Sequence, residues 1–436
     1  MNTKSVFQNA KWIVGCKIAQ SIIQLIIGMI SARYLGPSNY GLINYAASIV
    51  AFALPVMRLG FNATLVHELI ETPEKEGEIL GTSLFLNFLS SVFCILGVVT
   101  FVTLVNAGEN TTIMVCFLYS LSLVFAALEM IQYWFQYKLK SKYSSVVMLV
   151  AYVLVSFYKI FLLVTAKNVY WFALVNCFDY AIISVSLLFI YFKIGKAKLS
   201  FSFSMAKAML SKSKHYMLSG IMVVAFQTTD HIMLLNIIDK KENGYYTAAI
   251  TAASVVQFVY IAIIDSYRPL ILSNKKENDA DYEKNISSLY SIVLYLALAQ
   301  SLAFFILAKP IIYILYGTDY SASVTVLRIL VWYLAFSFMG SVRNVWILAE
   351  QKQKYLWIIN LSGAVFNVLF NSVLIPFYGA VGAATASLAT QIFINFILGF
   401  IIKPIRPNNK LLLKGLNPKF AYQNFKNLVY LIKKKN

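Results

Sequence analysis

The chain has 436 residues, of which 59% are hydrophobic and 13% charged, and its formal net charge is +19. A soluble domain usually has about 25% charged residues, and a soluble protein could not bury so much apolar side chain, so lipid must be the solvent. The positive charge lies in short connections and in the tail, beside apolar segments. That distribution orients membrane helices and argues against a nucleic-acid partner.

A helix that crosses a membrane needs about 20 mainly apolar residues. Segments of this kind recur along the whole chain, so we predict an all-α membrane protein with about twelve transmembrane helices. The predicted spans lie near residues 12–33, 40–64, 79–105, 112–136, 144–165, 170–192, 216–238, 245–267, 287–308, 324–348, 356–375 and 379–402.

Lysine and arginine are concentrated in alternate connections, which predicts the orientation of the spans. The basic connection at residues 193–215 and the tail after Ile402, which has no acidic residue, are expected in the cytoplasm. Both termini are then cytoplasmic. The connection at residues 66–78 is acidic, but acidic residues contribute little to this rule.

The basic connection divides the chain into two halves that look like repeats. A shift of about 206 positions places Tyr40 on Tyr246 and Ser48 on Ser254, without a gap. We therefore predict an N-terminal six-helix lobe at residues 1–192, a basic linker at 193–215, a C-terminal six-helix lobe at 216–402 and a basic cytoplasmic tail at 403–436. Because each repeat would contain six helices, an even number, the two repeats would be parallel and related by an axis along the membrane normal.

No residue pattern indicates an enzyme, a cofactor or a metal site. The four cysteines (Cys16, Cys94, Cys116 and Cys177) lie separately in apolar stretches, and the three histidines lack metal-ligand spacing. No Walker motif or glycine-rich phosphate loop is present, so this chain does not supply ATP hydrolysis. A transporter of this sequence would draw its energy from an ion gradient or from consumption of the transported product outside.

Polar residues recur inside the predicted spans at spacings near three, four and seven, which places them on one face of each helix. Such a face does not meet lipid. It meets either another helix, through hydrogen bonds, or a water-filled cavity through which a polar headgroup passes while its lipid tail stays in the membrane. The candidate cavity residues are Lys17, Gln20, Gln24, Arg58, Glu129, Lys159, Asp179, Asp230, Asp265 and Arg268.

Several of these ions also have structural explanations. Lys159 and Asp179 lie at similar depth in adjacent antiparallel helices, so we expect an ion pair first and a substrate site second. Arg268, Arg328 and Arg343 would extend toward the membrane interfaces. His231 is expected to be a helix-packing residue.

Three motifs are distributed along the chain. The first is ARYLGPSNYG at residues 32–41, followed by Leu59-Gly60-Phe61. The others are PIIYILYGTDY at residues 310–320 and NVLFNSVLIPFYGAVGAA at residues 367–384. Together they resemble motifs of bacterial polysaccharide flippases of the Wzx type. These flippases share the multidrug/oligosaccharidyl-lipid/polysaccharide exporter superfamily with the MATE drug exporters.

The resemblance implies a MATE-like, V-shaped pair of six-helix lobes around a central cavity with alternating access, in the bacterial plasma membrane. Its implied substrate is an oligosaccharide repeat unit on undecaprenyl diphosphate, for capsule, exopolysaccharide or O-antigen assembly. Its implied partners are membrane lipids, a polysaccharide polymerase and glycosyltransferases. The alternative with the same fold is a cation-coupled multidrug exporter, and a third is a non-transporting scaffold for synthases.

The cations of the N-terminal half favour a phosphate ligand over a cationic drug. Lys17 lies about 9 Å from the inner end of its predicted helix and Arg58 near the inner end of the next. We expect both to donate charge-assisted hydrogen bonds to a diphosphate in an inward-open cavity. In the alternative, Lys17 extends to the inner headgroups and Arg58 pairs with a loop acid such as Glu68.

Overall fold

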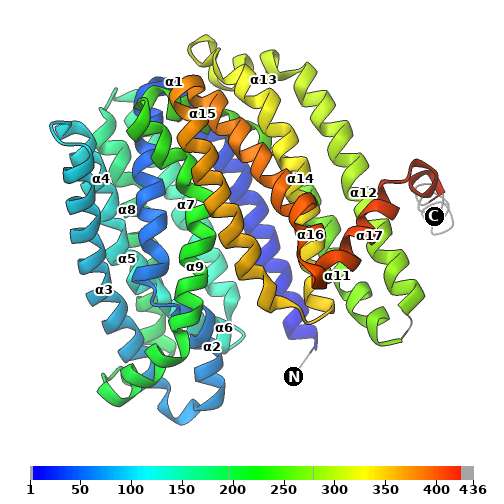
Figure 1. Cartoon of the computed structure of the whole chain (residues 1–436). Coiled ribbons are helices and arrows are strands. Elements are labelled where there is room, and N and C mark those ends of the chain that lie inside the picture. The colour runs from blue at the N-terminus through cyan, green and yellow to red at the C-terminus, as the bar shows by residue number, and fades with distance from the viewer. Residues whose placement is uncertain (1–2, 196, 278, 424–436) are drawn as a thin grey trace. The chain divides into compact units, whose positions relative to one another are not determined.

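The computed structural model of the chain describes residues 3–195, 197–277 and 279–423. Within these ranges the regular structure is helical and no strand occurs (Figure 1). Among the described residues, nine helices are long and apolar enough to cross a membrane, and a tenth span results if the two helices of one bent pair count together as one span. Two of the nine, at Ile26–Glu71 and Gln353–Ile401, are long enough for two crossings each. If each of these two long helices counts as two spans, the ten spans become twelve, which is the number predicted from the sequence.

Each of these double-length helices is two spans joined at one glycine. α1 (Thr3–Met57) breaks at Gly36, whose φ is 68°, and α15 (Leu356–Ile392) breaks at Gly379, whose φ is 53°. Only glycine adopts this left-handed backbone at little cost. Figure 1 shows the chain reversing direction at both breaks, α1 in blue and α15 in orange.

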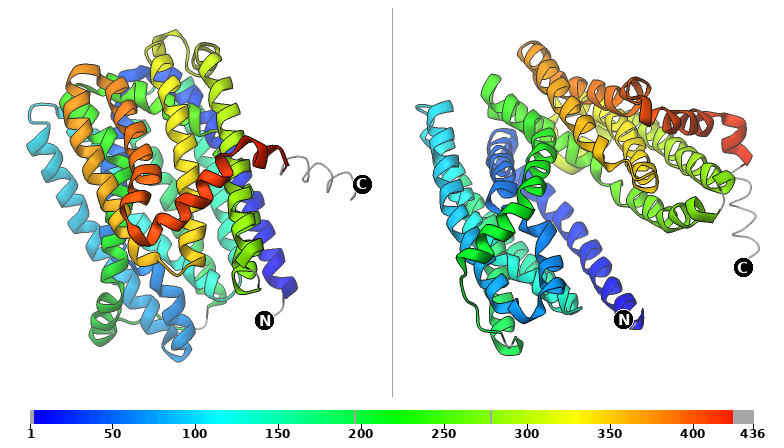
Figure 2. Two further views of the ribbon diagram at one scale, coloured as in Figure 1. Left: turned by 45° about the vertical axis from the view of Figure 1, so that its right-hand side comes forward. Right: turned by 60° about the horizontal axis from the view of Figure 1, so that its bottom comes forward.

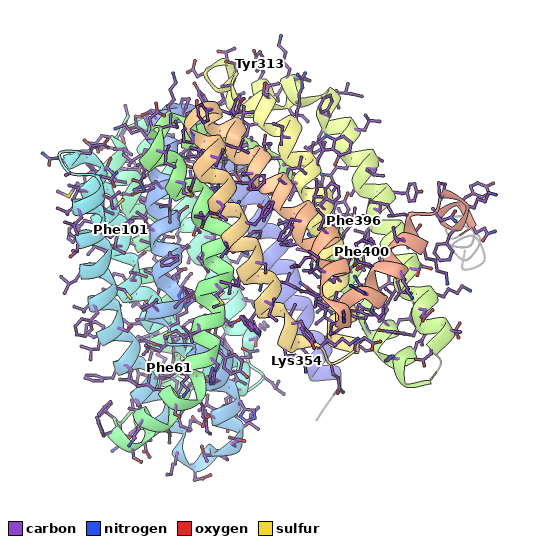
Figure 3. All side chains as sticks on the ribbon, viewed as in Figure 1. Phe61, Phe101, Tyr313, Lys354, Phe396 and Phe400 are labelled. Atoms are coloured by element: carbon purple, nitrogen blue, oxygen red, sulfur yellow. The ribbon has the colours of Figure 1, made fainter. Side chains whose placement is uncertain are left out.

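The chain divides into two compact units, residues 1–244 and 245–436. Apolar side chains pack inside the first unit around Tyr45 and Leu123 and around Phe61 and Trp134. Other large apolar side chains, such as Phe101 and Phe400, are exposed (Figure 3). Exposed apolar side chains are normal where lipid is the solvent.

The second predicted span ends earlier than the sequence suggests. α1 stops at Met57, and α2 (Phe61–Glu71) begins after a short turn in which Leu59 has a φ of 50° and Gly60 a φ of 75°. The acidic connection predicted at residues 66–78 is therefore largely helical. It contains the rest of α2, a 3₁₀ turn (Pro73–Lys75) and the start of α3 (Glu76–Val105).

The remaining spans of the first unit are broken to different degrees. The fourth consists of α4 (Asn110–Ser120), α5 (Ser122–Leu128), a 3₁₀ turn (Glu129–Ile131) and α6 (Gln132–Tyr137). α7 (Ser141–Val164) and α8 (Val169–Ile194) are continuous. α9 (Phe203–Ile237) begins inside the predicted basic linker and packs along α1, with Gly220 against Pro55 and Tyr45 bonded to Asn236.

The units and the predicted lobes are divided at different places. α9 packs within the first unit, although the repeat boundary assigns its sequence to the second lobe. A repeat is defined by sequence order, whereas a compact unit is defined by packing, so the two boundaries need not coincide. The two six-helix lobes remain a prediction.

The second unit begins within α10 (Lys240–Ser254), which is followed by α11 (Gln257–Glu277). The two form the bent pair, at 45°. α12 (Asp279–Ile306), the short α13 (Ala308–Tyr316) and α14 (Ser323–Ala349) follow. After α15, a π-helical stretch (Phe393–Ile397) leads into α16 (Leu398–Ile401).

The described part of the basic tail, residues 403–423, contains one longer helix. α17 (Arg406–Leu416) leaves the end of α16 and packs on α12 (Figures 1 and 2). Tyr290 of α12 donates a 2.8 Å hydrogen bond to the Oδ1 of Asn408, and Tyr295 donates one of 2.9 Å to the carbonyl of Leu416. Asn408 and Asn409 are fully buried, whereas Lys410 and Lys414 on the other face are exposed.

Candidate functional site

The main charged contact inside the first unit joins Arg58 to Glu129. The Nη2 of Arg58 lies 3.3 Å from the Oε2 of Glu129, and the Arg58 side chain is 24% exposed while that of Glu129 is 8% exposed. Two residues that the sequence named separately as cavity candidates therefore form one pair. Glu68, the expected alternative partner of Arg58, instead bonds to Lys212 at 2.9 Å.

Local breaks in two helices position this pair. Arg58 follows the last residue of α1, where the left-handed backbone at Leu59 and Gly60 stops the helix. Glu129 begins the 3₁₀ turn between α5 and α6. Both side chains thus start from irregular backbone inside a span, and such backbone is tolerated at membrane depth only where protein or water surrounds it.

More polar groups surround Glu129. Asp179 of α8 is near enough to interact electrostatically with Glu129, and so is Tyr180. The Oδ1 of Asp179 is buried and has no hydrogen-bond partner. A buried carboxylate oxygen without a donor costs free energy, so this position is suited to a water molecule or a polar ligand.

Lys159 of α7 lies near Asp179 and interacts with it electrostatically. The two side chains do not form a salt bridge within 4.0 Å, so the expected direct ion pair is looser than the sequence suggested. Together, Arg58, Glu129, Asp179 and Lys159 make a polar network with equal numbers of cations and anions. Pairing of this kind lowers the cost of charge inside a membrane.

Arg58 also lines a pocket of about 430 Å³, which we call the Arg58 pocket. It lies between the end of α1, the start of α2 and α9. Its other lining residues are Ala51, Leu54, Pro55, Gly60, Asn62, Ala63, Tyr216, Met217, Ser219, Gly220, Val223 and Val224. The Nε of Arg58 is buried and has no hydrogen-bond partner, so it is not the atom that would meet a ligand. An arginine has five donors, and Glu129 lies against Nη2, so the donors of Nη1 remain for a ligand in the pocket.

The other predicted cation of this region is not placed. The side chains of Lys17, Gln20 and Gln24 lie outside the described residues, although their backbone belongs to α1. The expected joint action of Lys17 and Arg58 therefore stays a prediction.

Asp230 is buried in α9. Beside it, the Nδ1 of His231 lies 2.8 Å from the Oδ1 of Asn243, and Asn243 donates to the carbonyl of Gly41 at 2.8 Å. His231 thus joins α9 to α10 and through it to α1, which agrees with the expected packing role.

Asp265 and Arg268 form a local ion pair on α11. The Nη2 of Arg268 lies 2.9 Å from the Oδ1 of Asp265, one helical turn away, and both side chains are about half exposed. Exposed pairs at this spacing contribute little free energy. Nothing in this contact distinguishes a substrate site from a surface pair.

The position of Arg343 differs from the one predicted from the sequence. The sequence predicted that its side chain extends to the interface, but it is buried in α14 at 5% exposure. Its Nη1 donates a 2.7 Å hydrogen bond to the carbonyl of Ile394, in the π-helical stretch. Its Nε has no partner, and Tyr290 is near enough to interact electrostatically. By contrast Arg328, half-buried, lies over the ring of Phe305, as a peripheral arginine would.

A polar triad that the sequence did not single out lies around Tyr45, in the part of α1 after Gly36. The hydroxyl of Tyr45 lies 2.9 Å from the Oδ1 of Asn106 and 3.2 Å from the Oδ1 of Asn236, and the Nδ2 of Asn106 donates to the Oδ1 of Asn236 at 3.0 Å. These residues come from α1, the end of α3 and α9. No single segment contains the pattern, so only the packing reveals it.

Two further polar clusters lie around α2 and α3. His67, Glu68 and Glu71 have ligand atoms within 4.8 Å of one another, but the ammonium of Lys212 lies 2.9 Å from Glu68 and 3.6 Å from Glu71. A cation therefore already neutralises these acids.

In the second cluster, Glu76 accepts hydrogen bonds of 2.6 Å from Trp134 and from Lys138. Burial alone would lower the pKa of Lys138, but the hydrogen bond and charge of Glu76 outweigh this effect and raise the pKa.

Comparisons with known proteins agree with this architecture. A family model described as "Polysaccharide biosynthesis protein" matches residues 6–274. The "Capsular polysaccharide biosynthesis protein CapF" of Staphylococcus aureus is 23% identical over 405 residues, which cover 88% of this chain and 96% of that protein.

Among solved structures, "Lipid II flippase MurJ, inward closed conformation" has a TM-score of 0.71 at 15% identity and covers 96% of this chain and 97% of its own. An inward-facing MATE family multidrug transporter has a TM-score of 0.69 at 12% identity, covering 89% of this chain and 96% of its own. At such identities the likeness shows the fold, and it confirms the predicted all-α, MATE-like class.

Proposed function

The chain belongs to the polysaccharide biosynthesis protein family, and we propose that it is a flippase for undecaprenyl-diphosphate-linked oligosaccharide repeat units. It would move these units across the bacterial plasma membrane for capsule, exopolysaccharide or O-antigen assembly. The multi-pass helical architecture and the MATE-like fold support transport, and the family and the capsular relative support this class of substrate.

The observation that carries the proposal is the Arg58 pocket. A half-buried arginine, held by Glu129 and retaining free donors, lines a pocket inside a membrane-spanning unit. Charge-assisted hydrogen bonds from arginine to phosphate oxygens are each worth roughly 1.5–3 kcal/mol. Such a pocket favours an anionic headgroup over the cationic compounds that many drug exporters carry.

The direction of transport suits an anion. A membrane potential of about 100 mV, negative inside, favours outward movement by about 2.3 kcal/mol per negative charge. A diphosphate headgroup would gain this energy. Glu129 next to Arg58 would keep the empty site nearly neutral, so that the pocket does not hold the headgroup too tightly for release.

The test is translocation of a fluorescent or radiolabelled polyprenyl-diphosphate oligosaccharide in proteoliposomes. We expect Arg58→Gln to lower the rate about tenfold or more, which corresponds to the loss of roughly one charge-assisted hydrogen bond. Arg58→Lys keeps the charge and should keep part of the activity. The double variant Arg58→Gln/Glu129→Gln, which leaves no unpaired charge, should fold normally and still fail to transport.

Arg328→Gln is the matched control, because Arg328 also lies in a span but contacts Phe305 and not the Arg58 pocket. Wild-type transport by the double variant at normal abundance would place the headgroup site elsewhere. If the wild-type protein exported cationic dyes against a gradient and did not move the lipid-linked sugar, it would be the multidrug exporter of the same fold.

A further inference from the structure

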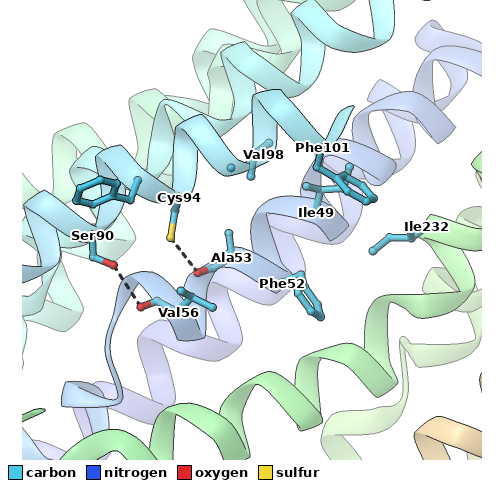
Figure 4. A pocket seen from close by; sticks show the side chains of 11 residues that line it. Ile49, Phe52, Ala53, Val56, Ser90, Cys94, Val98, Phe101 and Ile232 are labelled. Atoms are coloured by element: carbon cyan, nitrogen blue, oxygen red, sulfur yellow. Dashed lines mark hydrogen bonds between the residues drawn. The ribbon is translucent and has the colours of Figure 1, made fainter. Parts of the chain in front are cut away.

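An apolar groove runs between α1, α3 and α9, on the last turns of α1 (Figure 4). Its volume is about 520 Å³. The lining residues are Ile49, Phe52, Ala53 and Val56 of α1, Ser90, Phe93, Cys94, Gly97, Val98 and Phe101 of α3, and Ile232 of α9. We call it the α1–α3 groove.

The wall of this groove offers no free polar group to a ligand. The hydroxyl of Ser90 donates to the carbonyl of Val56 at 3.3 Å, and the thiol of Cys94 donates to the carbonyl of Ala53 at 3.8 Å. Figure 4 shows both hydrogen bonds joining α3 to α1. The other lining side chains are apolar. A ligand that needs hydrogen bonds would lose them here, so the occupant must be hydrocarbon.

The groove is long, and no side chain fills the space beside Gly97. Along α3 it extends from Ser90 to Phe101, roughly 16 Å at 1.5 Å per residue. A Cβ added at Gly97 would meet nothing within 4 Å. Phe52, Phe93 and Phe101 stand exposed around it. Its shape therefore suits an extended chain.

The groove ends close to the Arg58 pocket. The two sites lie on different faces of α1 at the same height, since Val56 of the groove and Arg58 of the pocket differ by roughly 3 Å along the helix axis. They meet at the edge where Phe52 of the groove and Pro55 of the pocket are neighbours one turn apart, and α9 borders both. Both sites flank the same last turns of α1. An anionic site next to a hydrocarbon site matches the chemistry of a phosphorylated lipid.

We propose that the α1–α3 groove holds the polyprenyl chain of the lipid carrier while its diphosphate lies at Arg58. This inference rests on the proposed function and adds where the carrier's hydrocarbon is held. Lipid tails in the bilayer are as apolar as the groove, so burial alone gives no preference. Packing positions the chain, and the cation at Arg58 selects the diphosphate of the carrier over the single phosphate of a phospholipid.

The experiment is photo-crosslinking of the wild-type protein in nanodiscs. The probes are a diazirine-bearing polyprenyl diphosphate and a diazirine-bearing phosphatidylglycerol at equal mole fraction, with crosslinked peptides mapped by mass spectrometry. We expect the polyprenyl probe to label the peptides of residues 49–56 and 90–101 about tenfold more than the phospholipid probe. Unlabelled undecaprenyl diphosphate should compete, and Arg58→Gln should remove most of the preference.

Gly97→Phe fills the groove and should lower this labelling about tenfold. Gly28→Phe is the matched control, because Gly28 is also a span glycine with open space around its Cβ position but does not line the groove. Equal labelling by both probes, or unchanged labelling of Gly97→Phe, would overturn the inference. A wild type that translocates the lipid-linked sugar without groove labelling refutes the groove alone, whereas a wild type that translocates none refutes the proposed function.

Discussion

Arg58 and Arg343 show two ways of keeping an arginine inside a membrane protein. Arg58 is half-buried, pairs with a carboxylate and keeps donors free toward a pocket. Arg343 is buried, and its Nη1 donates to a backbone carbonyl in a π-helical stretch. A carbonyl carries only part of a charge, so the first arginine is the better compensated and the more available to a ligand.

The Arg58–Glu129 pair can be tested by a double-mutant cycle on unfolding in detergent. Glu129→Gln leaves a cation unpaired and Arg58→Gln leaves a buried anion unpaired, so each single change should destabilise the protein by about 1–3 kcal/mol. The double change should cost less than the sum of the two. Strict additivity would mean that the two side chains do not interact.

Sequence reasoning found both partners of this pair but not the pairing. Polar residues in apolar spans are conspicuous, so Arg58 and Glu129 were named as candidates. The helix break at residues 58–60 is not visible as a pattern, and an uninterrupted helix suggested a loop acid as partner for Arg58. The sequence predicts an interfacial Arg343 because the π-helical carbonyl of Ile394, which accepts its hydrogen bond, cannot be inferred from apolar periodicity.

Single glycines decide where several elements turn. Gly60 has a left-handed backbone, and a Cβ there would clash with the carbonyl of Ser213 in α9. This residue both ends the second span and allows α9 to approach. Without this break, Arg58 would project from a continuous helix.

Replacement of Gly60 by alanine should therefore be costly. The left-handed backbone alone costs roughly 1–2 kcal/mol for a residue with a Cβ, and the contact with α9 adds to it. Gly28→Ala is the control, because Gly28 lies in a helix with open space around it and alanine there should stabilise by up to about 1 kcal/mol. Thermal unfolding of the two variants in one detergent measures the difference. Equal melting temperatures would show that Gly60 is not constrained.

The docking of α17 is the element that the sequence described least well. Its basic residues suggest a tail in the cytoplasm, yet its buried face joins Leu411 and Leu412 to the polar Asn408 and Asn409. The Oδ1 of Asn408 accepts from α12 and the Nδ2 of Asn409 donates to the carbonyl of Phe396, which offsets part of the cost of their burial. Partners of this kind are set by tertiary structure alone.

Tyr290→Phe should loosen α17. It removes the hydrogen bond to Asn408 and leaves a buried amide oxygen without a donor, at a cost of about 1–3 kcal/mol. Hydrogen–deuterium exchange at residues 406–416 should become faster. Lys410→Gln, on the exposed face of the same helix, should leave exchange unchanged. Faster exchange in both variants would mean that α17 is held by charge and not by this contact.

At the scale of the whole molecule, the sequence predicted the class, the spans and the family, because apolar length and basic connections are properties of segments. The orientation of the spans remains a proposal. In a variant without its native cysteines, a membrane-impermeant thiol reagent applied from outside should label Ala107→Cys and miss Ser204→Cys. Both positions are exposed. Ala107 is preferable to its neighbour Gly108, whose φ of 88° disfavours substitution. The reverse labelling would invert the topology.

The one-residue turns at Gly36 and Gly379 also affect how the chain is made. Two spans that meet at a single glycine have almost no polar segment between them that must be carried across the membrane during synthesis. Each such pair would enter the bilayer as a ready-made helical hairpin, with the first helix held near the insertion machinery until the second emerges. The same short connection leaves only a few exposed residues at each turn, such as Tyr34 and Tyr378, for a protease to cut or an antibody to recognise.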